Sequence, residues 1–164
     1  MPELQPPIVS TLAGRAYWRP MSTLGEGRIV VGTARGERGD AIDIVRRWFD
    51  AMTSGDVDSA SRLMAPGQRI TISGGHRFSS LVEFAAFASD RCLEVRKQCD
   101  SFEACEAAGG LAVYVRGEMS GVWKDGQSFS RVRWCDRFLI QASAIIEVET
   151  FSDLAEARSA GLNQ

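Results

Sequence analysis

The first candidate for chemistry in this sequence is Asp136, which lies in a stretch of alternating residues. The chain reads SFSRVRWCDRF from Ser128 to Phe138, and alternate residues of a β-strand face opposite sides. Val132, Trp134 and Phe138 therefore share a face with Asp136. Because that face is apolar and expected to be buried, the carboxylate must be paired, protonated or beside a polar cavity. We interpret Asp136 as a general acid or base. The alternative is a structural carboxylate held by an arginine or by backbone donors.

His76 is the only histidine and the second candidate. Ile70 and Ile72 occupy alternate positions before it, so His76 would face the same pocket if Gly74-Gly75 does not reverse the strand. A histidine near an aspartate forms a proton-transfer pair that its surroundings can tune. The alternative is a surface histidine in a glycine-rich turn. Without a suitably placed third group, a hydrolase triad is not predicted.

Six bulky aromatic residues complete the predicted site as substrate-binding side chains. Most are expected to belong to the core, and some to line a pocket that favours flat, apolar ligands. They are Trp48, Phe49, Phe84, Phe87, Trp134 and Phe138.

The elements that must position these residues follow from periodicity and capping. Apolar stripes predict helices over 41–52 and 57–64, and a third from 81 to about 91, capped by Asp40, Asp56 and Ser80. A short strand, 69–73, separates the second and third helices. The remaining strands are predicted over 93–107, 111–123, 128–140 and 144–151, before a last helix that ends at Gly161.

This order predicts an α+β fold, in which three N-terminal helices pack on one face of a mostly antiparallel sheet. Gly117 and Gly121 within a long strand indicate strong curvature. A curved sheet closed by helices leaves a conical pocket between them. Residues 1–39 are rich in proline and glycine and are predicted to be an N-terminal extension or arm, with the domain at 40–164.

Composition excludes several classes of function. With 164 residues and a net charge of −2, nothing favours nucleic acid or an anionic membrane as partner. The N-terminus lacks a signal-peptide pattern, so a cytoplasmic location is predicted and not export. Because no two cysteines form a C-x-x-C pair, free thiols in a reducing cytoplasm are predicted and not a zinc site. The cysteines are Cys92, Cys99, Cys105 and Cys135. No metal or organic cofactor is predicted.

Several segments resemble a known superfamily. They are Val45–Met52, Ser54–Asp58, Leu63–Ala65, Phe129–Phe138 and Glu149–Asp153. Over roughly 40–160 the chain is similar to the nuclear-transport-factor-2-like group, which includes SnoaL-like polyketide cyclases, ketosteroid isomerases, scytalone dehydratase and limonene epoxide hydrolase. The resemblance implies a cone-shaped α+β barrel with an apolar pocket, often a homodimer through the outer sheet face. It implies no single chemistry, because many members only bind.

The best-known site residues of these relatives are not matched here. The tyrosine of ketosteroid isomerases falls at Trp48, their general-base aspartate near Ile72 and their oxyanion-hole acid near Trp134. None of these three residues is an acid or a tyrosine. Arg116-Gly117-Glu118 has the arginine–acid spacing of limonene epoxide hydrolase, but the third member falls near Thr150. A charged pair on the outer sheet face is the alternative for Arg116 and Glu118.

Together these features predict a small-molecule-binding, enzyme-like protein without a cofactor. Asp136, with His76 as partner, would perform isomerisation, cyclisation or dehydration on an apolar, ring-containing molecule. The competing hypothesis is a non-catalytic ligand-binding or dimerisation module of the same fold, in which Asp136 is structural.

Overall fold

The computed structural model describes residues 35–161. The predicted N-terminal arm therefore lies almost wholly outside the described residues. The helices are α1 (Arg35–Ser54), α2 (Val57–Arg62), α3 (Leu81–Arg91) and α4 (Leu154–Gly161). The strands are β1 (Met64–Ile72), β2 (His76–Phe78), β3 (Cys92–Ala107), β4 (Gly110–Trp123), β5 (Ser128–Gln141) and β6 (Ala144–Ser152).

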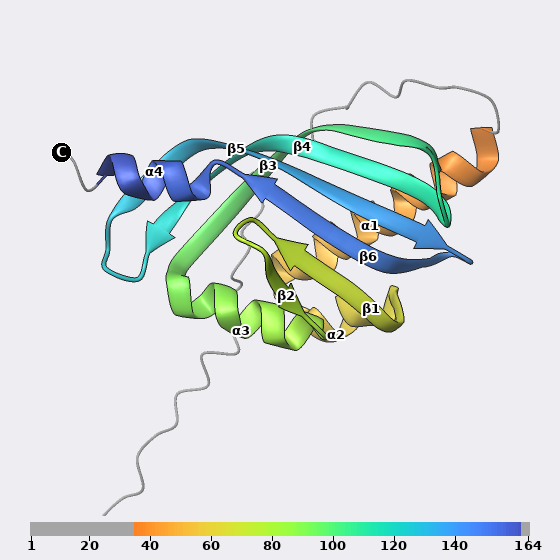
Figure 1. Cartoon of the computed structure of the whole chain (residues 1–164), viewed down its shortest axis with the longest axis horizontal. Coiled ribbons are helices and arrows are strands. Elements are labelled where there is room, and N and C mark those ends of the chain that lie inside the picture. Colours follow the sequence, from red (N-terminus) through yellow and green to blue (C-terminus); the bar gives the residue numbers. More distant parts are fainter. Residues whose placement is uncertain (1–34, 162–164) are drawn as a thin grey trace, which may run out of the picture.

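The strands form one curved sheet in the order β2-β1-β6-β5-β4-β3. β1 runs parallel to β6, and the other neighbours are antiparallel. The long helix α1 crosses behind the sheet, and α2 and α3 lie below it beside β1 and β2 (Figure 1). The predicted α+β class, with helices on a mostly antiparallel curved sheet, is confirmed.

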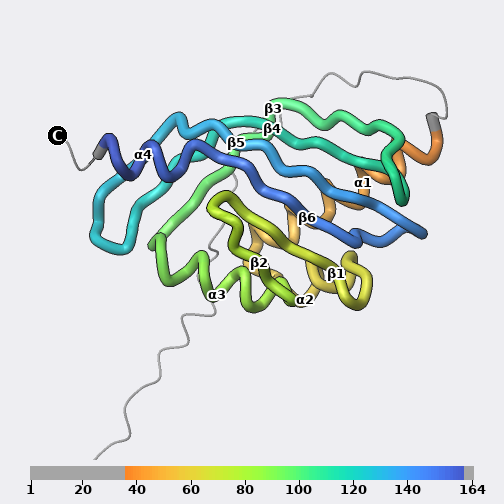
Figure 2. The backbone as a smooth tube through the Cα atoms, in the orientation of Figure 1, coloured from red at the N-terminus to blue at the C-terminus, as the bar shows by residue number. Residues whose placement is uncertain are grey.

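Strands β3 to β6 form a continuous meander, which can be followed in Figure 2. The predicted alternation of β5 is confirmed, since Val132, Trp134, Asp136 and Phe138 are all buried. On the opposite face Arg137 forms ion pairs with Glu147 and Glu149 of β6, so it pairs within its own chain. The homodimer expected through this outer face stays a prediction.

Three details of the predicted elements are wrong. Helix α1 begins at Arg35, so Asp40 is an exposed residue inside the helix and not its N-cap. Arg38, in the first turn of α1, forms an ion pair with Glu106 of β3 at 3.2 Å, a tertiary contact that local sequence patterns do not contain. Helix α2 ends at Arg62, before the predicted Met64.

The segment that contains Pro66-Gly67 belongs to β1 and does not only break a helix. The register of β1 against β6 shifts between Met64 and Arg69, an irregularity that lets a strand accommodate a proline. Strand β2 is not among the predicted strands, because three residues are too few to show alternation.

The core lies between α1 and the inner face of the sheet. The Trp48 ring is 5.2 Å from that of Phe138, and the Phe49 ring is 5.8 Å from that of Trp134 (centroid distances). Phe102 of β3 also packs on Phe49, at 6.4 Å. Within residues 35–161, no helix is both long and apolar enough to cross a bilayer.

Candidate functional site

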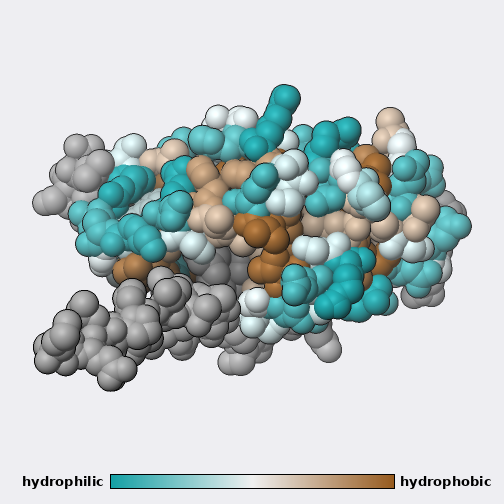
Figure 3. Space-filling model, turned by 90° about the horizontal axis from the view of Figure 1, so that it is seen from below, coloured by the Kyte–Doolittle hydropathy of each residue, from teal (hydrophilic) through white to brown (hydrophobic). Residues whose placement is uncertain are grey.

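A cavity of about 340 Å³ lies between the sheet and two helices, and its lining comes from the end of β1, from β2, α3, β3, β4 and β6, and from the start of α4. Its apolar lining comes from Ile72, Phe84, Phe87, Ala88, Val95, Met119, Leu154 and Ala155. Its polar lining comes from Ser73, His76, Arg91, Cys92, Lys97, Thr150 and Ser152. Viewed from below, apolar side chains reach the surface in the middle of a largely hydrophilic face (Figure 3). A mostly apolar cavity with a few polar groups is the usual form of a small-molecule site.

A buried ion pair joins the cavity to the core of the sheet. The Lys97 Nζ atom lies 2.5 Å from Asp136 Oδ2, and the two side chains are only 7% and 2% exposed. Lys97 lines the cavity, whereas Asp136 is not among the lining residues and lies behind it. The Asp136 Oδ1 atom is buried and has no hydrogen-bond partner among the described residues. Asp136 therefore does not face the cavity itself but forms an ion pair with Lys97, which does.

The aromatic core also holds the Lys97 ammonium group. Its Nζ atom lies 4.0 Å from the centroid of the Trp134 ring and 5.8 Å from that of Phe49. A cation over an aromatic face is attracted to the ring electrons, and more strongly when water is excluded. Trp134 and Phe49, predicted to bind substrate, therefore contact the lysine that faces the cavity.

The strand register explains how Lys97 reaches across the sheet. Lys97 of β3 pairs with Met119 of β4, and Asp136 of β5 pairs with Val115 of the same strand. Gly117 lies between those two positions of β4, so no β4 side chain stands between the lysine and the aspartate. A bulge between Cys99 and Ser101 also shifts the register of β3 beside this point.

Lys97 is the functional candidate that the sequence reasoning missed. Val95 and Cys99 are buried on either side of it at alternate positions of β3. The alternation argument that singled out Asp136 on β5 therefore applies equally to Lys97. The alternation is hard to recognise in the sequence because Leu93–Ala107 contains polar residues on both faces of the strand. The bulge between Cys99 and Ser101 also interrupts it.

The remaining predicted site residues fall into two groups. His76, Phe84 and Phe87 line the cavity, and the His76 ring lies 4.9 Å from the Phe87 ring. Trp48 and Phe138 belong to the packed core and are not among the lining residues. Within the described chain no hydrogen bond or ion pair joins His76 to Asp136: His76 is an exposed residue that lines the cavity, whereas Asp136 is buried and does not line it.

Ser73 ties the end of β1 to β6 at the cavity. Its hydroxyl donates to the Thr150 carbonyl oxygen at 3.3 Å and accepts from the Ser152 backbone N–H at 2.9 Å. The three residues all line the cavity. This link fixes the wall of the cavity that carries the hairpin with His76.

Three solved structures share this architecture at low sequence identity. A putative SnoaL-like polyketide cyclase from Jannaschia sp. superposes with a TM-score of 0.64 and 18% identity, over 79% of this chain and 96% of that one. An NTF2-like protein of unknown function from Burkholderia pseudomallei gives 0.63 and 18%, over 71% and 93%. The chain has the nuclear transport factor 2-like (NTF2-like) fold. An LEH-like epoxide hydrolase from M. tuberculosis gives 0.59 and 14%, over 77% and 92%.

These similarities establish the NTF2-like fold. They do not establish a reaction, which must be argued from the residues of this chain. No protein-family model matches the sequence, and no curated protein matches it either. Across residues 35–161, no group of three His, Cys, Asp or Glu side chains is placed to hold a metal ion.

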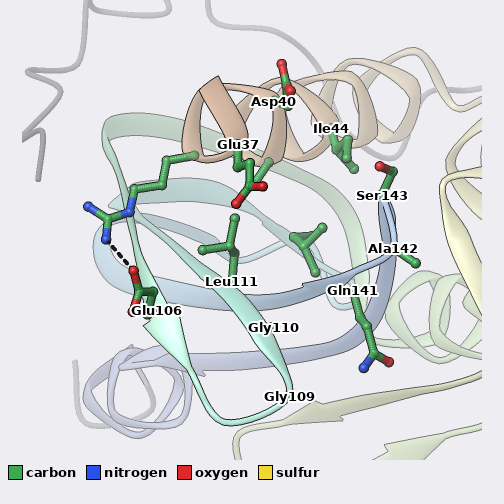
Figure 4. Close-up of a pocket in the computed structure, with 13 residues that line it drawn as sticks. Glu37, Asp40, Ile44, Glu106, Gly109, Gly110, Leu111, Gln141, Ala142 and Ser143 are labelled. Carbon is green, nitrogen blue, oxygen red and sulfur yellow. Dashed lines mark hydrogen bonds and ion pairs between the residues drawn. The ribbon is translucent and has the colours of Figure 1, made fainter. Parts of the chain in front are cut away.

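The chain has a second, more polar hollow of about 600 Å³ beside the first turns of α1 (Figure 4). Glu37 and Leu111 reach toward each other across it, and the Arg38–Glu106 ion pair closes one side. Exposed residues form another side: Gln141 at the end of β5, and Ala142 and Ser143 in the turn that follows. Within the described part of the chain, its lining has no aromatic side chain and no member of a buried ion pair, so the first cavity is the better candidate site.

Cys99 lies close to the buried ion pair and offers a test of its surroundings. Burial raises the pKa of the Cys99 thiol from 9.0 to about 11; Lys97 opposes this shift and Asp136 adds to it. Since thiolates are the reactive form, we expect iodoacetamide at pH 8 to alkylate exposed Cys105 well before Cys99, as read by peptide mass spectrometry.

The same shift has a consequence for stability against pH. Because the folded pKa is raised, the contribution of Cys99 to folding is complete below pH 9 and is lost between pH 9 and about 11. A Cys99→Ala variant should lack this component of the alkaline loss of stability in urea titrations. Equal alkylation rates for Cys99 and Cys105 in the folded protein would contradict the buried, neutral thiol.

Proposed function

We propose that the protein binds an apolar, ring-containing small molecule in the 340 Å³ cavity and transfers a proton on it, as an isomerase, cyclase or dehydratase does. The observation that carries this proposal is the buried Lys97–Asp136 ion pair, whose lysine lines a mostly apolar cavity. Ionisable groups in such surroundings are typical of functional sites.

The proposed chemistry assigns one role to each polar group. For an isomerisation, His76 removes a proton from the carbon between a ring carbonyl and a ring double bond and returns it to the far carbon of that double bond, so that the double bond moves into conjugation with the carbonyl. The electron pair moves onto the carbonyl oxygen, where the Lys97 ammonium group donates a hydrogen bond to the developing negative charge. Asp136 acts through Lys97, because its carboxylate holds the ammonium group in position and balances its charge.

A two-ring ketone, β-tetralone, tests this proposal without knowledge of the natural substrate. We expect the full chain to be stabilised by the ketone in a thermal-shift measurement and to speed exchange of its acidic carbon-bound protons in D₂O, followed by NMR. His76→Gln should lower the protein-dependent exchange by about a hundredfold or more while the thermal shift remains.

Arg77→Gln is the matched control, because Arg77 is the exposed neighbour of His76 in β2 and does not line the cavity. It should leave both binding and exchange unchanged. Binding without protein-dependent exchange would overturn the catalytic part and favour the ligand-binding module. Unchanged exchange in His76→Gln would overturn the role of His76.

A further inference from the structure

We infer that the ligand of this cavity carries a carboxylate, which lies at the mouth on Arg91 while the ring occupies the apolar interior. This inference rests on the proposed function and narrows its ligand to a ring-containing carboxylic acid. Its starting point is the charge of the lining: among residues 35–161, Arg91 and Lys97 line the cavity, and no aspartate or glutamate does. A cavity lined by one sign of charge attracts ligands of the opposite sign.

Arg91 is placed to receive an anion. It is the last residue of α3, and its guanidinium carbon lies 5.2 Å from the centroid of the Phe87 ring. Phe87 in turn contacts the His76 ring, so the aromatic side chain holds a cation on the cavity rim. Among residues 35–161, Arg91 forms no ion pair with an acid, whereas Arg133 and Arg158 do. A guanidinium group binds a carboxylate through parallel hydrogen bonds.

Lys97 is the poorer position for the carboxylate. Its ammonium group is already paired with Asp136 at 2.5 Å, so a second carboxylate there would lie beside the first. Two carboxylates that share a site repel each other, and one of them must take up a proton. A neutral carbonyl oxygen meets no such penalty at Lys97. The geometry thus orients the ligand with its carbonyl inward and its carboxylate outward.

A naphthalene carboxylate and its methyl ester test the inference, because they share the ring and differ in charge. In calorimetric titrations of the full chain at low salt, we expect the carboxylate to bind about fivefold more tightly than the ester, as for an exposed ion pair. Arg91→Gln should abolish this preference and leave binding of the ester unchanged. Raising the ionic strength should reduce the preference in the parent protein.

Arg77→Gln again serves as the control, since it removes an exposed arginine near the cavity that is not part of its lining. Equal affinity for carboxylate and ester would overturn the inference but leave the proposed function standing. Equal weakening of both probes in Arg91→Gln would also overturn it, because Arg91 would then act only as a wall. If neither these probes nor β-tetralone bind, the proposed function itself fails.

Discussion

Asp136→Asn is expected to lower the free energy of unfolding by about 3–5 kcal/mol, the usual cost of removing one partner from a buried ion pair. The amide keeps the size of the side chain but removes the negative charge that lies 2.5 Å from the Lys97 ammonium group. Because both side chains are almost fully buried, water cannot replace the lost carboxylate. Urea denaturation at neutral pH, compared with the parent chain, measures the change.

The control for this substitution is Asp153→Asn, which makes the same chemical change in the Arg133–Asp153 ion pair. That pair is 2.7 Å long, but its side chains are 81% and 46% exposed. Its loss should cost no more than about 1 kcal/mol. A similar small loss for Asp136→Asn would show that the buried pair does not carry charge in solution.

A double variant separates the loss of charge pairing from the loss of packing. Lys97→Met with Asp136→Val replaces both ions by apolar side chains, and such replacements are often neutral or stabilising. We therefore expect the double variant to be more stable than Asp136→Asn. If the double variant is as stable as the parent chain but does not speed proton exchange in β-tetralone, the ion pair is needed for function and not for stability. Retained exchange in a stable double variant would overturn the role proposed for Lys97.

Gly117→Ala is expected to cost about 3 kcal/mol or more, the upper range for overpacking a buried position. A methyl group at Gly117 would overlap the carbonyl oxygen of Gln98 in β3, and backbone cannot move aside as a flexible side chain can. The close approach occurs beside the β3 bulge, so relief of the overlap would pull β3 away from β4. Urea denaturation measures the loss.

Gly39→Ala is the matched control, because the same methyl group is added where no atom of the described residues outside the helix's own backbone lies within 4 Å. Gly39 is an exposed residue of α1, so alanine should raise stability by about 0.5–1 kcal/mol through its helix propensity. The two variants therefore differ in the sign of their effect. A Gly117→Ala protein as stable as the parent would contradict the backbone contact.

Local patterns in the sequence predicted the elements well where one signal dominated. Ser80 caps α3 by accepting a hydrogen bond from the Glu83 backbone N–H, as its capping box indicates. The buried face of β5 followed from its alternation. In contrast, α1 begins at Arg35, before the Asp40 cap that the sequence indicates, and Arg38 in its first turn contacts Glu106 of β3, a tertiary contact that no local pattern contains.

The site was harder to predict than the fold for a geometric reason. Phe84 and Trp48 have similar sequence signatures, yet one lines the cavity and the other packs against Phe138. Whether an inward aromatic meets space or another side chain depends on how α1 and α3 are spaced from the sheet. The Lys97–Asp136 pairing joins strands that are not neighbours, so it required the register of β4 as well.

The parallel contact of β1 with β6 bears on the order in which the molecule assembles. The meander from β3 to β6 joins strands that follow one another, whereas Ser73 and Thr150 are 77 residues apart. Contacts between distant segments form late, because a long loop must close first. The β1–β2 wall of the cavity is therefore expected to dock last and to detach first. A ligand too large for the mouth could enter through a local opening that leaves the meander folded.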